Sequence, residues 1–299
     1  MTVDMDGLVD LLRLECCADE SLSVDGSKLV CAGCKSGREV SDEGIVLNAG
    51  LDQAGPSGTD GYEWNTKHRY QSLGYAEHYT ARYAARSRLR DWYPRFVTGR
   101  ERAGVDQLMS RIHEDVRTVL DIPAGTGKLA PVHANYCYAV IAADVSAEML
   151  RSGFASGEWG HSSNLMGMLQ TDITAIELRD RAVDCTVCLR LMHRLPESVM
   201  MTALGELARV TRRYLIVSNA VRQTGLFSGS AVRRRWRNAM DPAQWRGLLR
   251  SVGTVEEEFR VSSLLSSEVI SLVRISSEGA QHSTEQQAPV SVRAPAATP

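Results

Sequence analysis

The chain has 299 residues, of which 43% are hydrophobic, and a formal net charge of −2; this length fits one large or two modest domains with a substantial core. The near-balanced charge gives no overall signature of nucleic-acid binding. Without a run of about 18 apolar residues or a basic-then-apolar N-terminus, the sequence predicts neither a transmembrane helix nor a secretory signal, and we expect a cytoplasmic protein.

The first 49 residues have the pattern of a small β-rich module. Leu8–Leu14 is a short apolar-periodic piece, Asp25-Gly26 predicts a turn, and Val40–Leu47 is a further apolar stretch. Two cysteine pairs joined by a β-hairpin are the plan of a zinc ribbon, and the pairs here are Cys16 with Cys17 and Cys31 with Cys34. Two adjacent cysteines fit the tetrahedral coordination of one ion less well than two cysteines in a Cys-x-x-Cys motif. Two hypotheses therefore stay open: these cysteines hold Zn²⁺, or the ribbon has lost its metal and folds on apolar contacts.

The remaining cysteines have the pattern of reduced core residues. The chain has seven cysteines, an odd number, and no secretory signal, which argues against a disulfide framework. Cys185 and Cys188 share Cys-x-x-Cys spacing, but within a strand this spacing puts them on opposite faces. We therefore expect neither metal nor redox chemistry from this pair.

Residues 50–69 are predicted to be a linker, because residues 50–60 have a polar, Gly-rich composition. The next stretch is rich in aromatic residues. Tyr75, Tyr79 and Tyr83 repeat every four residues, which puts them on one face of a predicted helix. Most of this face is expected to pack on the core, although Tyr75 or Tyr79 is also placed to reach a ligand pocket.

Strand-like and helical segments alternate from residue 116 onward. Such alternation predicts a parallel sheet covered by helices on both faces, with ligands at the carboxyl ends of the strands. Helices are expected over Glu197–Thr211 and from Asp241 to Gly253. Residues 276–299 have the composition of a disordered tail. The predicted strands are Val116–Asp121, Val140–Asp144, Met168–Asp172, Val183–Leu189, Tyr214–Ser218, Val255–Val261 and Ser267–Ile275.

Residues 119–128 are the most informative segment, because the first of these strands ends there at Asp121 and a glycine turn, Ala124–Gly127, follows. Gly125 and Gly127 let the backbone approach a ligand closely and leave N–H groups exposed. A phosphate-binding P-loop is disfavoured, because Ile122 stands where its first glycine belongs and Leu129 replaces the hydroxyl residue. A dinucleotide site fits better, but an acid ahead of the glycines, here Asp121, suits a ligand with a cationic amine.

This Asp-x-x-x-Gly-x-Gly segment resembles motif I of the class I S-adenosylmethionine-dependent methyltransferases, in particular the small-molecule, methyltransferase type 11-like members. The stretch from Asp144 to Leu150 resembles the second motif, Gln170–Ile173 the segment beside the adenine, and Ala182–Leu189 the fourth strand. The resemblance covers about residues 75–275. It implies a Rossmann-like α/β fold, with a mostly parallel seven-stranded sheet and an antiparallel C-terminal hairpin, over residues 70–275.

The resemblance also implies a set of cofactor-binding residues. For each aspartate in this set, the alternative to cofactor binding is that its side chain only caps a helix N-terminus. Asp121 would accept from the cofactor ammonium group, and Asp144 from the ribose hydroxyls. The remaining contacts implied are the turn residues Ala124, Gly125 and Gly127; Val145 beside the ribose; Asp172 and Ile173 beside the adenine; and Leu189 and Arg190 as a wall after the fourth strand.

Two positions leave the chemistry open. Pro123 replaces the usual first glycine of motif I and has no N–H to donate. His193 stands where members of the family often carry a histidine near the site entrance. A structural role is the favoured interpretation, and the alternative is a base that deprotonates a phenol or hydroxyl acceptor.

The leading functional hypothesis is methyl transfer to the O, N or C atom of a small molecule by in-line displacement. The absence of an Asn-Pro-Pro-Tyr-like motif after the fourth strand lowers the odds of methylation at an exocyclic nitrogen. One rival is an rRNA or tRNA base methyltransferase, since the front module resembles those preceding some rRNA guanine methyltransferases and the run Arg233–Arg237 is basic. The second rival is a non-catalytic, methyltransferase-like scaffold.

Overall fold

The computed structural model describes residues 5–13, 21–48, 51, 92–136, 138–156, 158–159, 164–222, 239–263 and 266–276. Several features predicted from the sequence lie outside these residues. They are Cys16 and Cys17, the linker apart from Leu51, the repeat Tyr75, Tyr79 and Tyr83, the basic run at 233–237, and the tail beyond residue 276.

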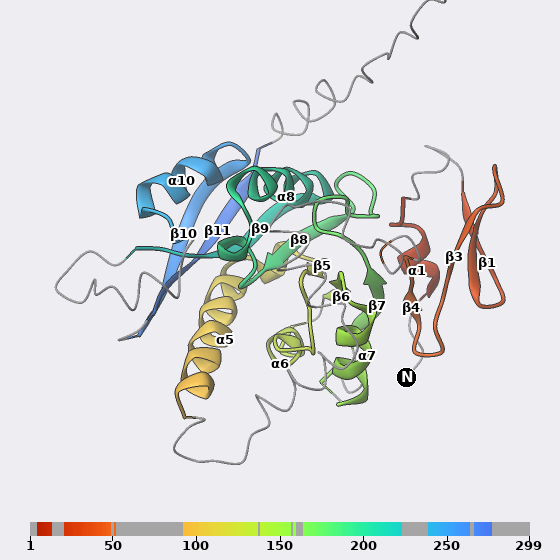
Figure 1. Cartoon of the computed structure of the whole chain (residues 1–299), viewed down its shortest axis with the longest axis horizontal. Coiled ribbons are helices and arrows are strands. Elements are labelled where there is room, and N and C mark those ends of the chain that lie inside the picture. The colour runs from red at the N-terminus through yellow and green to blue at the C-terminus, as the bar shows by residue number, and fades with distance from the viewer. Residues whose placement is uncertain are drawn as a thin grey trace, which may run out of the picture.

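An eight-stranded sheet forms the centre of the molecule (Figure 1), with the order β10-β11-β9-β8-β5-β6-β7-β4. The strands from β4 to β9 pair in parallel, whereas β11 pairs antiparallel with both β9 and β10. The predicted parallel sheet with an antiparallel C-terminal hairpin is therefore confirmed, and β4 adds an eighth strand at one edge. The strands are β4 Ile45–Val46, β5 Thr118–Asp121, β6 Ala139–Asp144, β7 Leu165–Gln170, β8 Val183–Cys188, β9 Thr211–Ala220, β10 Gly253–Ser263 and β11 Ser266–Ile275.

Helices cover both faces of this sheet, because its central strands are apolar on both sides. In β6, Val140 and Ala142 join one buried cluster, while Ile141 and Ala143 join the other. Figure 1 shows α5 and α7 on one face and α8 and α10 on the opposite face. The helices are α1 Met5–Val9, α5 Trp92–Ile112, α6 Ala130–His133, α7 Ala147–Ala155, α8 Glu197–Val210 and α10 Pro242–Arg250, with short 3-10 turns η2 His113–Asp115 and η3 Met192–Arg194.

The cysteine pair of β8 follows the predicted alternation. Cys185 belongs to the cluster under α5, and Cys188 belongs to the cluster under α8. Both thiols are fully buried, and burial raises the pKa of each well above its usual value. Both are free cysteines, as expected for reduced core residues.

The N-terminal segment combines a three-stranded antiparallel sheet with contacts to the main sheet. Strands β1 Leu22–Asp25, β2 Lys28–Cys31 and β3 Gly37–Glu39 form the small sheet, with the predicted turn at Asp25-Gly26. From the same segment, β4 pairs with β7, and Leu8 of α1 packs over Gly167. A Cβ at Gly167 would lie 2.5 Å from Leu8 Cδ2, so a side chain there would displace α1.

Helix boundaries follow the sequence signals closely. Asp241 is the N-cap of α10 and accepts a hydrogen bond from the Ala243 backbone N–H at 2.8 Å, within a capping box completed by Gln244. Helix α8 begins at Glu197, as predicted, and Pro196 is its N-cap residue. Among the described residues, no helix has both the length and the apolar content that a membrane span requires.

Candidate functional site

The glycine turn after β5 is held against β6. The backbone N–H of Ala124 donates to Ala143 O at 2.8 Å, and the Ile122–Pro123 peptide bond is cis. Gly125 and Gly127 have φ values of +55° and +83°, a region that favours glycine. A Cβ at Gly127 would also lie 2.8 Å from Glu158 Cβ. Both glycines are therefore required by the turn.

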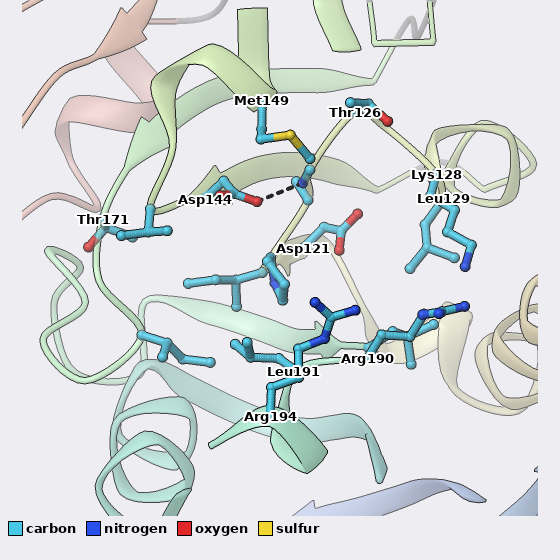
Figure 2. A pocket seen from close by; sticks show the side chains of 17 residues that line it. Asp121, Thr126, Lys128, Leu129, Asp144, Met149, Thr171, Arg190, Leu191 and Arg194 are labelled. Atoms are coloured by element: carbon cyan, nitrogen blue, oxygen red, sulfur yellow. Dashed lines mark hydrogen bonds between the residues drawn. The ribbon is translucent and has the colours of Figure 1, made fainter. Parts of the chain in front are cut away.

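Asp144, at the carboxyl end of β6, is tied to this turn. Its Oδ2 accepts the Gly125 N–H at 2.9 Å (Figure 2), and its Oδ1 accepts the Ser146 N–H at 3.0 Å. Burial raises the pKa of the Asp144 carboxyl to about 6, against the lowering effect of these backbone bonds. An ionised carboxylate has further acceptor sites on its two oxygens, so Asp144 retains capacity for a ligand.

A cavity opens at the carboxyl ends of the central strands, beside the turn and Asp144. Its apolar wall includes Ile173, Leu189 and Leu191, and its charged groups come from both acids and bases (Figure 2). The lining residues are Asp121, Ile122, Pro123, Ala124, Gly125, Thr126, Lys128, Leu129, Asp144, Val145, Met149, Thr171, Ile173, Leu189, Arg190, Leu191 and Arg194.

Eight of the residues predicted to bind a cofactor line this cavity. They are Asp121, Ala124, Gly125, Asp144, Val145, Ile173, Leu189 and Arg190. They come together because parallel strands end at the same edge of a sheet. Gly127 does not line the cavity, since its backbone faces Glu158 and Trp159 below the turn.

Asp172 is the second predicted cofactor residue that does not line the cavity. Strand β7 ends at Gln170, two residues earlier than the sequence pattern predicts. The Asp172 carboxylate instead accepts bonds from the backbone N–H and hydroxyl of Thr174, both at 2.9 Å. No helix follows Asp172, so this side chain stabilises a turn and does not cap a helix, while its neighbours Thr171 and Ile173 line the cavity.

Asp121 lies at the centre of the cavity wall, almost fully buried at the end of β5. Within the described residues its Oδ2 atom has no hydrogen-bond partner, although His133 Nε2 is 3.4 Å away. Burial raises the pKa of the Asp121 carboxyl, and His133 acts in the opposite direction. A buried carboxylate oxygen that lacks a donor is suited to a cationic ligand.

His193 lies in η3 and does not line the cavity. Burial lowers the pKa of its imidazole to about 4, with a further lowering effect from Arg190. The ring is therefore neutral at physiological pH, and it is a weak proton acceptor. This placement fits the structural interpretation of His193 better than the base.

Lys128 and Arg194 line the cavity but were not among the predicted site residues. Lys128 directly follows the glycine turn, and this position was a signal in the sequence that its side chain belongs to the site. Its side chain pairs with Glu101 of α5, which also accepts a bond from Arg190 Nη1 at 2.9 Å. No motif indicates Glu101, because it lies within a polar helical stretch 20 residues before Asp121.

The cysteine module gives no structural support for a metal. Cys31 is buried at the end of β2, and Cys34 is exposed with its Sγ 2.9 Å from Ser36 Oγ. Within the part of the chain that the structure describes, no group of three or more His, Cys, Asp or Glu side chains is placed to hold a metal ion. Zinc stays a prediction, since it depends on Cys16 and Cys17 outside that part.

Comparison with known proteins agrees with this geometry. Residues 119–213 match the family model described as a methyltransferase domain. The fold is similar to that of magnesium protoporphyrin IX methyltransferase from Synechocystis PCC 6803 with bound SAM, at 15% identity and a TM-score of 0.55, covering 73% of this chain and 99% of that chain. The same enzyme with bound SAH gives 16% identity and a TM-score of 0.56, covering 71% and 100%. Curated protein sequences give no match. The chain therefore has the class I methyltransferase fold.

Proposed function

We propose that this protein is a methyltransferase that uses S-adenosylmethionine. One observation carries the proposal: a buried aspartate, Asp144, is held by the glycine turn at the carboxyl end of β6 and faces the cavity. In an open α/β sheet, this is the place where ligands bind. The match of residues 119–213 to a methyltransferase domain supports the same conclusion.

The residues around the cavity fit the parts of this cofactor. Asp144 would accept hydrogen bonds from the ribose hydroxyls, because its two oxygens keep acceptor sites beyond those used by the Gly125 and Ser146 N–H groups. Asp121 would face the ammonium group, because its buried Oδ2 lacks a hydrogen-bond donor within the described residues. Ile173 and Leu189 would form an apolar wall for the adenine.

The chain's own residues would mainly position and desolvate the reactants. When bound, S-adenosylmethionine supplies a methyl group on a sulfonium that already carries its leaving group. The glycine turn and Asp144 would fix the nucleoside, and the apolar side chains would exclude water. An O–H or N–H acceptor would lose a proton on methylation, and this proton would leave to water, because the pKa of His193, lowered to about 4, makes its imidazole a poor proton acceptor.

We propose a small molecule as the methyl acceptor, at an O, N or C atom. The formal charge of −2 lacks the basic excess that is typical of RNA-binding proteins. Residues 189–191 after β8 are Leu-Arg-Leu and not an Asn-Pro-Pro-Tyr-like motif. Magnesium protoporphyrin IX methyltransferase, which has the same fold, is named for a small-molecule acceptor. The RNA alternative rests on Arg233–Arg237, which lie outside the described residues.

Calorimetric titration with S-adenosylmethionine and S-adenosylhomocysteine tests the proposal. Wild-type protein is expected to bind both in the micromolar range, about −8 kcal/mol. Asp144→Ala removes the acceptor of the ribose hydroxyls, so binding should weaken at least about 100-fold, by the loss of two charge-assisted hydrogen bonds.

Asp172→Asn is the matched control. Asp172 also lies buried just after a parallel strand, but it does not line the cavity. The control should bind S-adenosylhomocysteine as wild type does. Failure of the wild-type protein to bind either compound would contradict the enzyme proposal and favour the scaffold.

A further inference from the structure

One corner of the cavity carries two cations side by side. Lys128 follows the glycine turn, Arg190 follows β8, and both line the cavity. Figure 2 shows the ends of the two side chains close together, on the opposite side of Asp121 from Asp144. We call Lys128 and Arg190 the basic corner.

Glu101 of α5 holds the basic corner together. Its side chain has no exposed surface, and its two oxygens pair separately with Lys128 Nζ and with Arg190 Nη1. A single carboxylate carries one negative charge, so Glu101 by itself balances one of the two cations. The remaining charge is held close to the cavity in a poorly solvated place, where electrostatic interactions are strong.

The lowered pKa of Lys128 shows that Glu101 does not fully offset the burial of this ammonium and the charge of Arg190 beside it. Burial lowers the pKa of the Lys128 ammonium, and the neighbouring Arg190 lowers it further, although Glu101 opposes both effects. The surroundings thus disfavour the charged form of Lys128. An anion bound between Lys128 and Arg190 would reverse this balance.

Glu268 of β11 is a second acid near the basic corner, but it does not fully neutralise the second cation. It is buried, and its Oε1 accepts a hydrogen bond from Ser218 Oγ at 2.5 Å. Burial, together with the charge of Glu101, raises the pKa of the Glu268 carboxyl to about 7. Near neutral pH this side chain is therefore only partly ionised, so it adds less than one full negative charge beside the basic corner.

The backbone holds both cations in place. Arg190 has a φ of +60°, which is unusual for a residue with a side chain, and its N–H donates to Ser218 Oγ at 2.9 Å. The carbonyl oxygen of Lys128 accepts a bond from Arg102 Nε at 2.7 Å. A strained residue that its surroundings hold in position is typical of a functional site.

We propose that the basic corner binds an oxyanion, a carboxylate or phosphate group, on the methyl acceptor. This inference rests on the proposed function, because Asp144 and Asp121 are assigned there to the ribose and ammonium of the cofactor. Arginine and lysine together recognise an oxyanion through charge-assisted hydrogen bonds. The acceptor is accordingly an anionic small molecule. The methionine carboxylate of the cofactor has the same chemistry, and the experiment separates the two sources.

The experiment compares wild type with Lys128→Met, which removes the charge with a side chain only one atom shorter and leaves Glu101 paired with Arg190. Each protein is first titrated with S-adenosylhomocysteine and with 5′-methylthioadenosine, which lacks the amino-acid part. Each protein saturated with S-adenosylhomocysteine is then titrated with benzoate and with inorganic phosphate at low ionic strength. Arg151→Met is the control, since it removes a partly exposed cation of α7 that does not line the cavity.

The proposal predicts that the saturated wild type binds at least one of the two anions. Lys128→Met should weaken that binding about tenfold or more, the effect of one charge-assisted hydrogen bond, and Arg151→Met should not. Affinity for S-adenosylhomocysteine should change little in either variant, and equal thermal unfolding midpoints would show that Lys128→Met is folded.

Two outcomes would overturn the proposal. If Lys128→Met weakens S-adenosylhomocysteine but not 5′-methylthioadenosine, the basic corner holds the carboxylate of the cofactor. If the saturated wild type binds neither anion, or the variant binds them equally well, the corner is not an anion site. Failure of wild type to bind S-adenosylhomocysteine is a separate result, which contradicts the proposed function itself.

Discussion

At the scale of single residues, the site depends on carboxylates that the fold keeps out of water. Asp144 and Asp121 are both almost fully buried, and burial raises the pKa of each. Such groups are unfavourable in the isolated protein, but they gain when a ligand donates hydrogen bonds or brings positive charge. Ligand binding at this site should therefore depend on pH.

S-adenosylhomocysteine affinity is predicted to fall as the pH is lowered through about 6. The ribose hydroxyls would donate to the ionised form of Asp144, whose pKa is raised to about 6, so protonation would weaken this acceptor. Affinity should be level above pH 7 and decrease by up to about tenfold per unit below 6. Calorimetry between pH 5 and 8 measures this. Asp144→Asn should bind weakly and lose most of the dependence, and a level wild-type profile would contradict the assignment.

A second prediction concerns the groups behind Asp121. His133 is fully buried, with Nε2 3.4 Å from Asp121 Oδ2 and Nδ1 2.8 Å from the hydroxyl oxygen of Tyr138. Tyr138→Phe would leave Nδ1 buried without this partner. The free energy of unfolding should decrease by about 2 kcal/mol, measured by urea denaturation.

Tyr214→Phe provides the comparison for that prediction. Its hydroxyl lies 3.3 Å from Asp115 Oδ2, and Asp115 is exposed. Water can replace this bond, so the loss should be under about 1 kcal/mol. If both variants lose the same free energy of unfolding, the contact between Tyr138 and His133 stabilises the protein no more than the exposed contact does.

At the scale of elements, the N-terminal segment supports the β7 side of the cavity. Gln170 at the end of β7 accepts the Asn48 N–H at 3.0 Å and donates to Val145 O at 3.3 Å. Glu177, which is buried, accepts from Arg38 of β3 and from Asn48 at 3.2 Å. The small N-terminal sheet is thus linked by hydrogen bonds to residues next to the cavity wall.

Arg38→Ala is predicted to destabilise the protein by about 2 kcal/mol, because it leaves the buried Glu177 carboxylate without its cation. Arg13→Ala is the matched control. Arg13 pairs with Asp180 at 3.4 Å, and both side chains are largely exposed, so its loss should be within about 1 kcal/mol. Urea denaturation of the two variants compares them directly. An Arg38→Ala variant as stable as Arg13→Ala would mean that this contact does not hold the segment.

At the scale of the whole molecule, the sequence predicted what depends on local pattern. The strands ending at Asp121 and Asp144 were predictable, since each is a short apolar run that stops at an acid. Their convergence followed from parallel pairing. Strand β7 was placed less well, because Asp172 looked like a third such acid, whereas the strand ends at Gln170 and Asp172 binds Thr174.

The charged group beside the cavity could not have been predicted in the same way. Glu101 comes from a helix before the first strand of the domain, and Glu268 comes from the last strand. Their proximity arises from the sheet order, which puts β11 beside β9 and α5 over that face. The spacing of residues within a short stretch of sequence does not indicate such long-range contacts. The basic corner is therefore visible only in the folded chain.

A crystal structure of the protein with S-adenosylhomocysteine tests the central claim most directly. We predict the nucleoside in the cavity beside the glycine turn, with both ribose hydroxyls about 2.5–3.0 Å from the Asp144 carboxylate oxygens. The Gly125 N–H should still donate to Oδ2, as it does in Figure 2. A ligand bound elsewhere, or in this cavity with its ribose turned away from Asp144, would contradict the assignment of the site.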